Sequence, residues 1–135
     1  MPLNVLVVDD SNVMRSIIIR TLRLSGLPLE DVLQAQNGQE ALDVLSKHWI
    51  DLALVDINMP VMNGLELIEK VRKINEISDL PIIVVSTESS TTRIEMLKDM
   101  GVGFVHKPFS AETLREAVVE LTGVSLNETT SNEPV

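Results

Sequence analysis

Three carboxylates, one hydroxyl and one ammonium group stand just after short apolar runs in this sequence. They belong to Asp9, Asp10, Asp56, Ser86 and Lys107. Two carboxylates about 5 Å apart repel each other by roughly 3 kcal/mol at an effective dielectric constant near 20, so a cluster of acids is expected to enclose a cation. Mg²⁺ accepts one or two carboxylates and keeps water and phosphate oxygens as its other ligands. The set therefore predicts a Mg²⁺ site in which a carboxylate could attack phosphorus and form an aspartyl-phosphate.

Each of these groups also has an ordinary structural explanation. Asp9 and Asp10 could cap a strand end, Asp56 could occupy a turn, Ser86 could cap the next helix, and Lys107 could be a solvated lysine. Caps and turns do not explain why all five groups follow apolar runs, whereas a joint site does. Two positive charges from Mg²⁺ and one from the lysine would balance three carboxylates. The ammonium and hydroxyl groups would then stabilise charge on transferring phosphoryl oxygens.

The hydropathy pattern indicates the elements that must position these groups. Short apolar runs alternate with longer segments of helical periodicity, and several runs are continuous, as expected of strands buried on both faces. The predicted strands are Leu3–Val8, Val32–Ala35, Leu52–Val55, Ile82–Val85 and Val102–Val105. Strict alternation predicts an α/β fold, a doubly wound parallel sheet with helices on both faces. Ligands of such sheets bind beyond the carboxyl ends of the strands, where the polar groups stand.

The predicted helices carry their own boundary signals. Serines stand where N-caps belong, and glycines stand where left-handed C-terminal residues belong. These residues are Ser11, Ser90 and Ser110, and Gly26, Gly101 and Gly123. The apolar stripe of the first helix is predicted to consist of Val13, Met14, Ile17, Ile18, Thr21 and Leu22. His48 and Trp49 are expected to close the opposite end of the sheet, and the sequence assigns them no function.

The composition excludes several classes of protein. An excess of 20 Asp and Glu over 11 Lys and Arg, with a net charge of −9, argues against binding to nucleic acid or to an anionic membrane surface. Without cysteine there is no disulfide and no thiolate zinc site. No glycine-rich segment follows the first strand, so a dinucleotide or P-loop site is not supported. The apolar runs are too short to span a membrane, and a cytoplasmic protein is expected.

The end of the chain differs from the rest. Residues 124–135 are polar, contain no lysine or arginine and show no periodicity. We expect one folded domain over residues 1–123 and a flexible C-terminal tail over 124–135. No further domain is expected after residue 123, so any output would pass through non-covalent binding.

The chain resembles the receiver domains of two-component response regulators, especially stand-alone chemotaxis regulators of the CheY type. The resemblance covers about residues 3–122. It is carried by Asp9-Asp10, Asp56-Ile57-Asn58-Met59-Pro60 with Gly64, Ser86, and Lys107-Pro108-Phe109. It implies a flavodoxin-like sheet of five parallel strands in the order 2-1-3-4-5, with five helices. It also implies a cis peptide bond between Lys107 and Pro108.

The resemblance implies a role for each site residue. Asp56 would be the phosphoacceptor, and Lys107 would bind the phosphoryl group. Mg²⁺ would be held by Asp9, Asp10 and Asp56 and by the backbone carbonyl of Asn58. The switch residues would be Ser86, whose hydroxyl moves toward the phosphoryl group, and Phe104, which swings inward with it.

Departures from the usual family pattern suggest how the phosphoryl group behaves. Thr87 stands where the family most often has alanine or another small residue, and its bulk would restrict access of the phosphodonor. Asn58 and Glu88 resemble the pair found in chemotaxis regulators with short-lived phosphoryl groups. The sequence therefore predicts an aspartyl-phosphate that lasts seconds to minutes. Phe104 has no hydroxyl with which to contact a partner.

The predicted function is a phospho-receiver switch rather than a turnover enzyme. A histidine kinase would supply the phosphoryl group, and an output protein, such as a flagellar-motor component, would bind the face of the fourth helix, fifth strand and fifth helix. A phosphatase is a further candidate partner. The candidate surface consists of Ile94, Glu95, Lys98, Phe104, His106 and Arg115.

Two alternatives use the same residues. A phosphorelay carrier would pass the phosphoryl group on to a second histidine protein. An aspartate-nucleophile phosphatase would act on outside substrates, but such enzymes place an acid two residues after the nucleophile, where this chain has Asn58.

Overall fold

Five parallel strands form one sheet in the order β2-β1-β3-β4-β5. The computed structural model describes residues 2–87 and 90–124. The strands are β1 (Leu3–Val8), β2 (Leu29–Ala35), β3 (Leu52–Val55), β4 (Ile82–Ser86) and β5 (Gly103–His106). The helices are α1 (Asn12–Leu24), α2 (Gly38–Lys47), α3 (Gly64–Arg72), the short 3₁₀ helix η1 (Asn75–Ile77), α4 (Thr91–Asp99) and α5 (Ala111–Thr122). The predicted fold class and strand order are confirmed.

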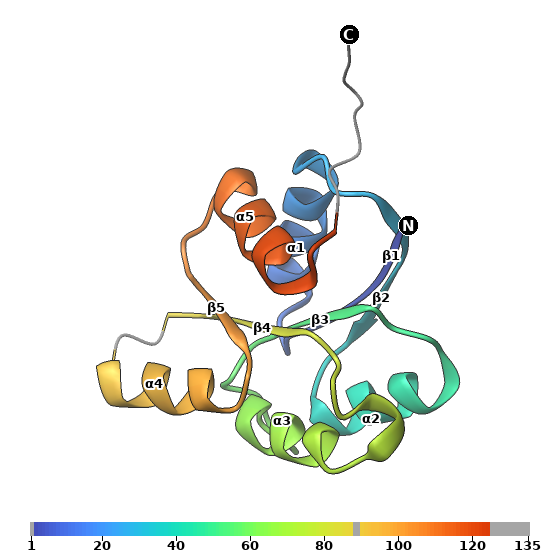
Figure 1. Ribbon diagram of the computed structural model, residues 1–135, viewed down its shortest axis with the longest axis vertical. Helices are drawn as coiled ribbons and strands as arrows, with labels where there is room; N and C mark the ends of the chain where they lie inside the picture. Colours follow the sequence, from blue (N-terminus) through green and yellow to red (C-terminus); the bar gives the residue numbers. More distant parts are fainter. Residues whose placement is uncertain (1, 88–89, 125–135) are drawn as a thin grey trace, which may run out of the picture.

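The helices cover both faces of the sheet. Figure 1 shows α1 and α5 on one face and α2, α3 and α4 on the other. Consecutive residues of the central strands therefore point into different cores: Leu6 and Val8 pack with α2 and α3, whereas Val5 and Val7 pack with α1 and α5. Burial on both sides explains why these strands are continuous apolar runs rather than alternating ones.

The helix boundary signals are confirmed. Ser11, Ser90 and Ser110 are the N-caps of α1, α4 and α5, and each side chain accepts a hydrogen bond from the backbone of the first helical turn. The glycines that follow the same three helices have positive φ angles. These values are +82° for Gly26, +75° for Gly101 and +72° for Gly123.

The predicted stripe of α1 is partly wrong. Val13 and Ile17 are 70% and 45% exposed. The buried residues of this helix are Arg15, Ile18 and Leu22, which lie three and four positions apart. Periodicity alone favoured burial of the apolar residues Val13 and Ile17. Arg15 is buried instead, because hydrogen-bond acceptors lie within its reach and a satisfied polar group can be buried at little cost.

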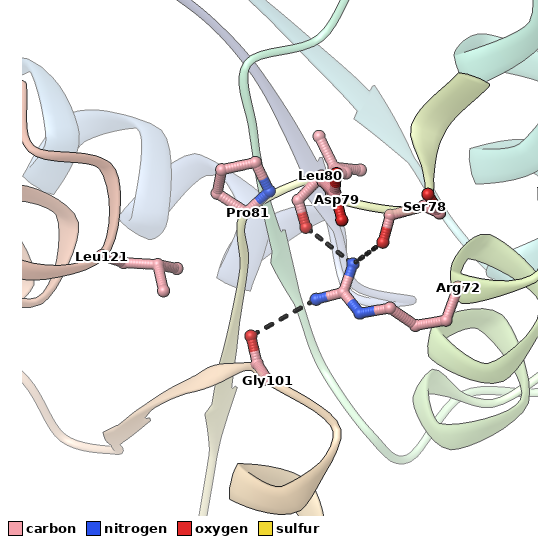
Figure 2. Close-up of a pocket in the computed structure, with 7 residues that line it drawn as sticks. All are labelled: Arg72, Ser78, Asp79, Leu80, Pro81, Gly101 and Leu121. Atoms are coloured by element: carbon pink, nitrogen blue, oxygen red, sulfur yellow. Dashed lines mark hydrogen bonds between the residues drawn. The ribbon is translucent and has the colours of Figure 1, made fainter. Parts of the chain in front are cut away.

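Arg72 joins three segments at the edge of the molecule that carries the N-terminal end of β4. Its guanidinium donates to the carbonyl oxygens of Ser78 (3.1 Å), Leu80 (2.8 Å), Met100 (3.1 Å) and Gly101 (3.4 Å). Figure 2 shows the hydrogen bonds to Ser78, Leu80 and Gly101 beside a pocket of about 270 Å³. The last turn of α3 is thereby tied to the loop before β4 and to the turn between α4 and β5.

In residues 2–87 and 90–124, no helix has both the length and the apolar character needed to cross a membrane.

Candidate functional site

The sheet brings Asp9 and Asp56 together at its carboxyl edge. Each follows the last residue of a strand, and those residues, Val8 and Val55, are paired across β1 and β3. The backbone N–H of Asp56 donates to the carbonyl of Val8 (2.9 Å), and that of Asp9 donates to the carbonyl of Ala35 in β2 (3.1 Å). Hydrogen bonding between the strands therefore continues into the site and fixes the backbone positions of Asp9 and Asp56.

Three carboxylates form one cluster at this edge. Oxygens of Asp9, Asp10 and Asp56 lie within 4.8 Å of one another. Asp9 and Asp56 are only 2% and 9% exposed, whereas Asp10 is exposed. Two such charges repel by about 3 kcal/mol at an effective dielectric constant near 20. A donor set made only of oxygens, with two buried members and one open to solvent, fits a hard divalent cation such as Mg²⁺.

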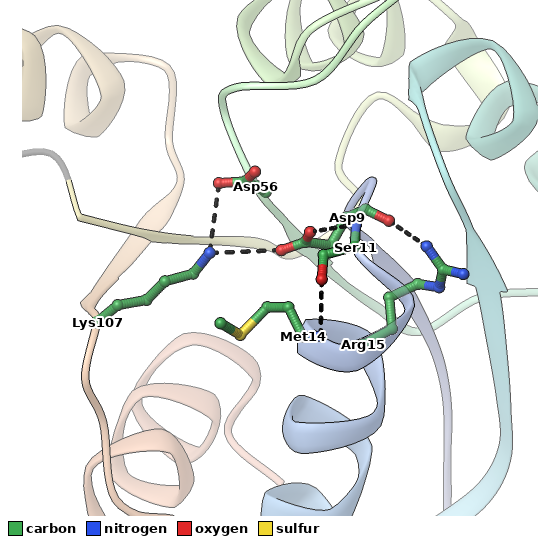
Figure 3. Close-up of polar contacts among 6 residues, drawn as sticks. All are labelled: Asp9, Ser11, Met14, Arg15, Asp56 and Lys107. Carbon is green, nitrogen blue, oxygen red and sulfur yellow. Dashed lines mark hydrogen bonds and ion pairs between the residues drawn. The ribbon is translucent and has the colours of Figure 1, made fainter.

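Lys107 is shared between two of these acids. Its Nζ lies 3.4 Å from Oδ2 of Asp9 and 3.7 Å from Oδ1 of Asp56, as Figure 3 shows. The backbone N–H of Lys107 donates to the carbonyl of Ser86 (2.9 Å), which sets the start of the side chain beside the end of β4. The peptide bond between Lys107 and Pro108 is cis, as the resemblance implied.

The environment of Asp56 raises the pKa of its carboxyl group. Burial is the largest cause, and the nearby negative charges of Asp9 and Asp10 act in the same direction. The ammonium of Lys107 and a hydrogen bond from the backbone of Ile57 oppose the shift. Charged Asp56 is thus disfavoured in the protein alone, so a bound cation would stabilise its carboxylate form.

Gly64 allows the first residue of α3 to lie directly against the backbone carbonyl of Asp56. A Cβ at this position would lie 2.4 Å from the carbonyl oxygen of Asp56, which is far inside contact distance. The backbone N–H of Gly64 donates to the carbonyl of Ile57 (2.9 Å). Asn63 and Glu66 close the first turn with a capping box. The helix start therefore braces the residue pair Asp56-Ile57.

The other predicted site residues lie at the ends of β4 and β5. Ser86 is fully buried and is paired with His106 across the two strands. Phe104 is half-buried against the core, and its ring meets that of His106 edge to face at 5.5 Å. Thr87, next to Ser86, is exposed. The switch roles of Ser86 and Phe104 and the access role of Thr87 stay predictions.

Predicted roles in metal binding and in phosphoryl lifetime fall on Asn58 and Glu88. Asn58 is exposed, two residues beyond Asp56. Its backbone carbonyl as a metal ligand and its side chain as a determinant of phosphoryl lifetime stay predictions. Glu88 lies outside the described residues.

The predicted output face is mixed in character. Phe104, Ile94 and Arg115 are half-buried, whereas Glu95, Lys98 and His106 are exposed. Met96 of α4, which the sequence did not single out, adds an apolar side chain that is 46% exposed.

The sequence analysis missed Arg15, which is 6% exposed. Its guanidinium donates to the backbone carbonyl of Asp9, to the side chain of Asn12, and through Nε to Oε1 of Gln34 at 2.8 Å. Figure 3 shows Arg15 and Lys107 approaching Asp9 from opposite sides. Its burial could have been inferred from its position, because Arg15 lies three residues before Ile18 on the face of α1 that enters the core. Arg15 holds the loop that carries the first two carboxylates.

The loop after Asp56 contains a second missed feature. Val61 has a φ angle of 66°, a left-handed conformation that β-branched residues seldom adopt. The backbone N–H of Met62 donates across it to the carbonyl of Pro60 at 2.7 Å. The loop after Asp56 thus carries local strain at Val61.

Comparison with known proteins agrees with this fold. The response regulator receiver domain matches residues 5–119, so the chain belongs to that family. It is 41% identical to "Chemotaxis protein CheY homolog" of Campylobacter jejuni, covering 93% of this chain and 97% of that protein. It is 40% identical to "Chemotaxis protein CheY1" of Helicobacter pylori, covering 91% and 99%. The solved structure of chemotaxis response regulator CheY4 of Vibrio cholerae superposes with a TM-score of 0.78 at 34% identity, covering 90% of this chain and 99% of that one.

Family membership identifies the general role. Receiver domains of this kind are signalling switches rather than classical enzymes, and histidine kinases phosphorylate them. They use Mg²⁺ in general, which agrees with the cluster of Asp9, Asp10 and Asp56.

Proposed function

We propose that this chain is a phospho-receiver switch in which Asp56 accepts a phosphoryl group from a histidine kinase. The observation that carries the proposal is the position of Asp56: buried at the end of β3, within 4.8 Å of two further carboxylates and 3.7 Å from the ammonium of Lys107. Burial and the nearby charges of Asp9 and Asp10 raise the pKa of the Asp56 carboxyl group, so a bound cation would favour its charged, nucleophilic form.

The proposed step is an in-line displacement at phosphorus. A carboxylate oxygen of Asp56 forms the new O–P bond, the P–N bond to the kinase histidine breaks, and the imidazole nitrogen keeps the electron pair. Lys107 places a positive charge beside the oxygen of Asp56 and stabilises the transferring group. Asp9, Asp10, Asp56 and the carbonyl of Asn58 would hold Mg²⁺, which when bound neutralises the acids and draws charge from the phosphoryl oxygens.

The proposed output is altered protein binding. The hydroxyl of Ser86 would move to the phosphoryl group, Phe104 would turn inward, and the face of α4, β5 and α5 would change its affinity for a partner. Relatives named as chemotaxis proteins match almost all of this chain. Their names support an output in chemotaxis, with a flagellar-motor component as the favoured target. A receiver domain over residues 1–123 and a cytoplasmic location belong to the same proposal. The predicted tail, apart from residue 124, lies outside the described residues.

The proposed phosphoryl group is short-lived. Asn58 and Glu88 would allow loss of the group within seconds to minutes, and Thr87 would slow its arrival. A half-life of many hours without added phosphatase contradicts this part of the proposal.

Intact mass spectrometry after treatment with acetyl phosphate and Mg²⁺ tests the acceptor. We expect one added phosphoryl group in the wild type and in Asp43→Asn, which removes an exposed acid of α2. Asp56→Asn should gain none. Equal gains in all three proteins contradict the proposal.

A transfer assay separates the switch from a phosphorelay carrier. Rapid passage of the label to a histidine phosphotransfer protein, with no change in any partner's affinity, would favour the carrier. Sustained hydrolysis of phosphomonoesters would favour the phosphatase.

A further inference from the structure

A groove of about 510 Å³ lies at the end of the sheet opposite the acidic cluster. It is formed by the N-terminal ends of the central strands, the segment between α2 and β3, and η1 with the loop that follows it. The residues that line it include Trp49, Ile50, Asp51, Glu76, Asp79 and Leu80. This volume falls in the usual range of ligand and anchor pockets.

The groove is separate from the phosphorylation site. Leu3, the first residue of β1, lines it, while Asp9 follows the last residue of the same strand. A strand of this length spans about 20 Å at roughly 3.3 Å per residue. None of the residues lining the groove belongs to the acidic cluster or to the predicted output face.

Trp49 is exposed to solvent while its indole N–H is hydrogen-bonded. Its side chain is 73% exposed, and its indole N–H donates to Oδ1 of Asp51 at 2.8 Å. The other carboxylate oxygen of Asp51 accepts from the backbone N–H of Asn4 at 2.8 Å, which ties the pair to β1. An ordered aromatic ring loses little freedom on binding, and tryptophan is a frequent anchor of protein interfaces.

The groove is lined by acidic side chains, which favour a positively charged ligand. Asp51, Glu76 and Asp79 line it, and the last two are exposed. Among the described lining residues there is neither lysine nor arginine. Carboxylates attract a cation, and the face of an indole ring does so as well. Leu80 and Ile50 supply apolar wall beneath them.

We propose that this groove is a docking site for an extended basic segment of a partner protein. An arginine of the segment lies against Trp49 and the carboxylates of Glu76 and Asp79, and a neighbouring leucine-sized side chain enters the pocket. Arginine suits the site better than lysine because its flat guanidinium stacks on an indole ring and forms paired hydrogen bonds with carboxylates. Docking there does not depend on the state of Asp56.

The chain's single tryptophan reports occupancy directly. The probe is a fluorescein-labelled amidated peptide with two arginines and two leucines, compared with the same peptide carrying glutamates for arginines. We expect saturable quenching of Trp49 emission by the unlabelled arginine peptide and a matching anisotropy curve with the labelled one. The glutamate peptide should do neither.

Variants separate the groove from the general negative charge of the protein. Trp49→Ala should weaken binding at least tenfold, and Glu76→Gln with Asp79→Asn should weaken it most at low salt. Glu69→Gln with Glu116→Gln makes the same change in charge at exposed positions outside the groove and should alter the Kd by less than twofold. Thermal unfolding of each variant checks that the fold is kept.

Three results would overturn the proposal: no binding of the arginine peptide to the wild type at millimolar concentration, equal binding by Trp49→Ala, or equal weakening by the groove pair and the control pair. Equal binding by Asp56→Asn and the wild type is expected, and a change there would refute independence from the phosphorylation site.

Discussion

Asp56 carries an electrostatic cost that can be measured without any phosphodonor. Its pKa is raised above the ordinary 3.8 mainly by burial, so the folded state favours the protonated form more than the unfolded chain does. The contribution of this group to stability is therefore greatest below the unfolded pKa and is lost as the pH rises through the higher folded pKa. At neutral pH the charged carboxylate destabilises the metal-free fold.

Asp56→Asn should therefore stabilise the protein in the presence of a chelator. We expect the free energy of unfolding at pH 7 to rise by about 1 kcal/mol, the usual scale of a single substitution. The gain should shrink as the pH falls toward the unfolded pKa, because the wild-type carboxyl group is then neutral. Urea titrations at several pH values measure the difference, and a gain that is independent of pH would contradict the explanation.

Arg15 should matter for the acidic cluster although it is not one of its ligands. Arg15→Met removes the hydrogen bond that holds the carbonyl of Asp9. Loss of such a supporting contact usually weakens metal binding by about tenfold or more. Arg20→Met, an exposed change on the same helix with the same loss of charge, is the control.

Calorimetric titration with Mg²⁺ distinguishes position from charge. If Arg15 acted only as a positive charge near the site, its removal would tighten Mg²⁺ binding. Weaker binding by Arg15→Met, with Arg20→Met unchanged, supports the positioning role, and the partial variant Gln34→Ala should show a smaller effect in the same direction.

Val61 offers a stabilising substitution. Its left-handed backbone costs roughly 1 kcal/mol or more for a residue with a branched Cβ. Val61→Asn should raise the free energy of unfolding by about 1 kcal/mol, because asparagine tolerates this conformation. Val13→Asn, at a similarly exposed valine within α1, should bring no such gain. Chemical denaturation compares the two, and equal effects would contradict the strain.

At the scale of elements, Arg72 fixes the C-terminal end of α4 by donating to the carbonyls of Met100 and Gly101. Arg72→Met removes a cation that donates to four carbonyl oxygens, and we expect a loss of about 3 kcal/mol in the free energy of unfolding. Lys70→Met, an exposed change in the same helix, should cost far less. Similar losses from both variants would contradict a role for Arg72 beyond that of a surface cation.

Most elements could be predicted because their signals are local. A continuous apolar run such as Leu52–Val55 fixes a buried strand, and a serine cap such as Ser110 fixes a helix start. The face of α1 could not be predicted, because two adjacent columns are apolar and only the acceptors around Arg15 decide between them. Two of its three acceptors come from β2 and from the loop after β1, which no local pattern connects to this helix.

The site was predictable for a related reason. Parallel strands deliver their last residues to one edge, so Asp9, Asp56 and Lys107 meet as soon as the strand order is known. The shape of the loop after Asp56 was not predictable. Its left-handed Val61 violates the usual preference of valine, and only the surrounding structure holds it.

Because the protein carries a net charge of −9, Mg²⁺ can stabilise the whole molecule in two ways, by binding at a specific site and by screening the repulsion between acidic side chains. Mg²⁺ at 100 times its Kd should raise the free energy of unfolding by about 2.7 kcal/mol through binding to the folded state alone. Screening of self-repulsion also stabilises an acidic protein. Sodium chloride of equal ionic strength separates the two.

The expected result is a rise in Tm with Mg²⁺ that sodium chloride does not match and that a chelator reverses. Asp9→Asn with Asp10→Asn should respond alike to the two salts. A wild-type response that sodium chloride reproduces in full would contradict a specific site at Asp9, Asp10 and Asp56.

The close approach of Gly64 to the carbonyl of Asp56 also has a genetic consequence. Every amino acid that a single nucleotide change can produce from a glycine codon carries a Cβ, and at this position a Cβ meets backbone atoms rather than a flexible side chain. Any such missense mutation must shift the start of α3 or the segment that carries Asp56. We therefore expect deep mutational scanning to find codon 64 intolerant of substitution, even though its residue performs no chemistry.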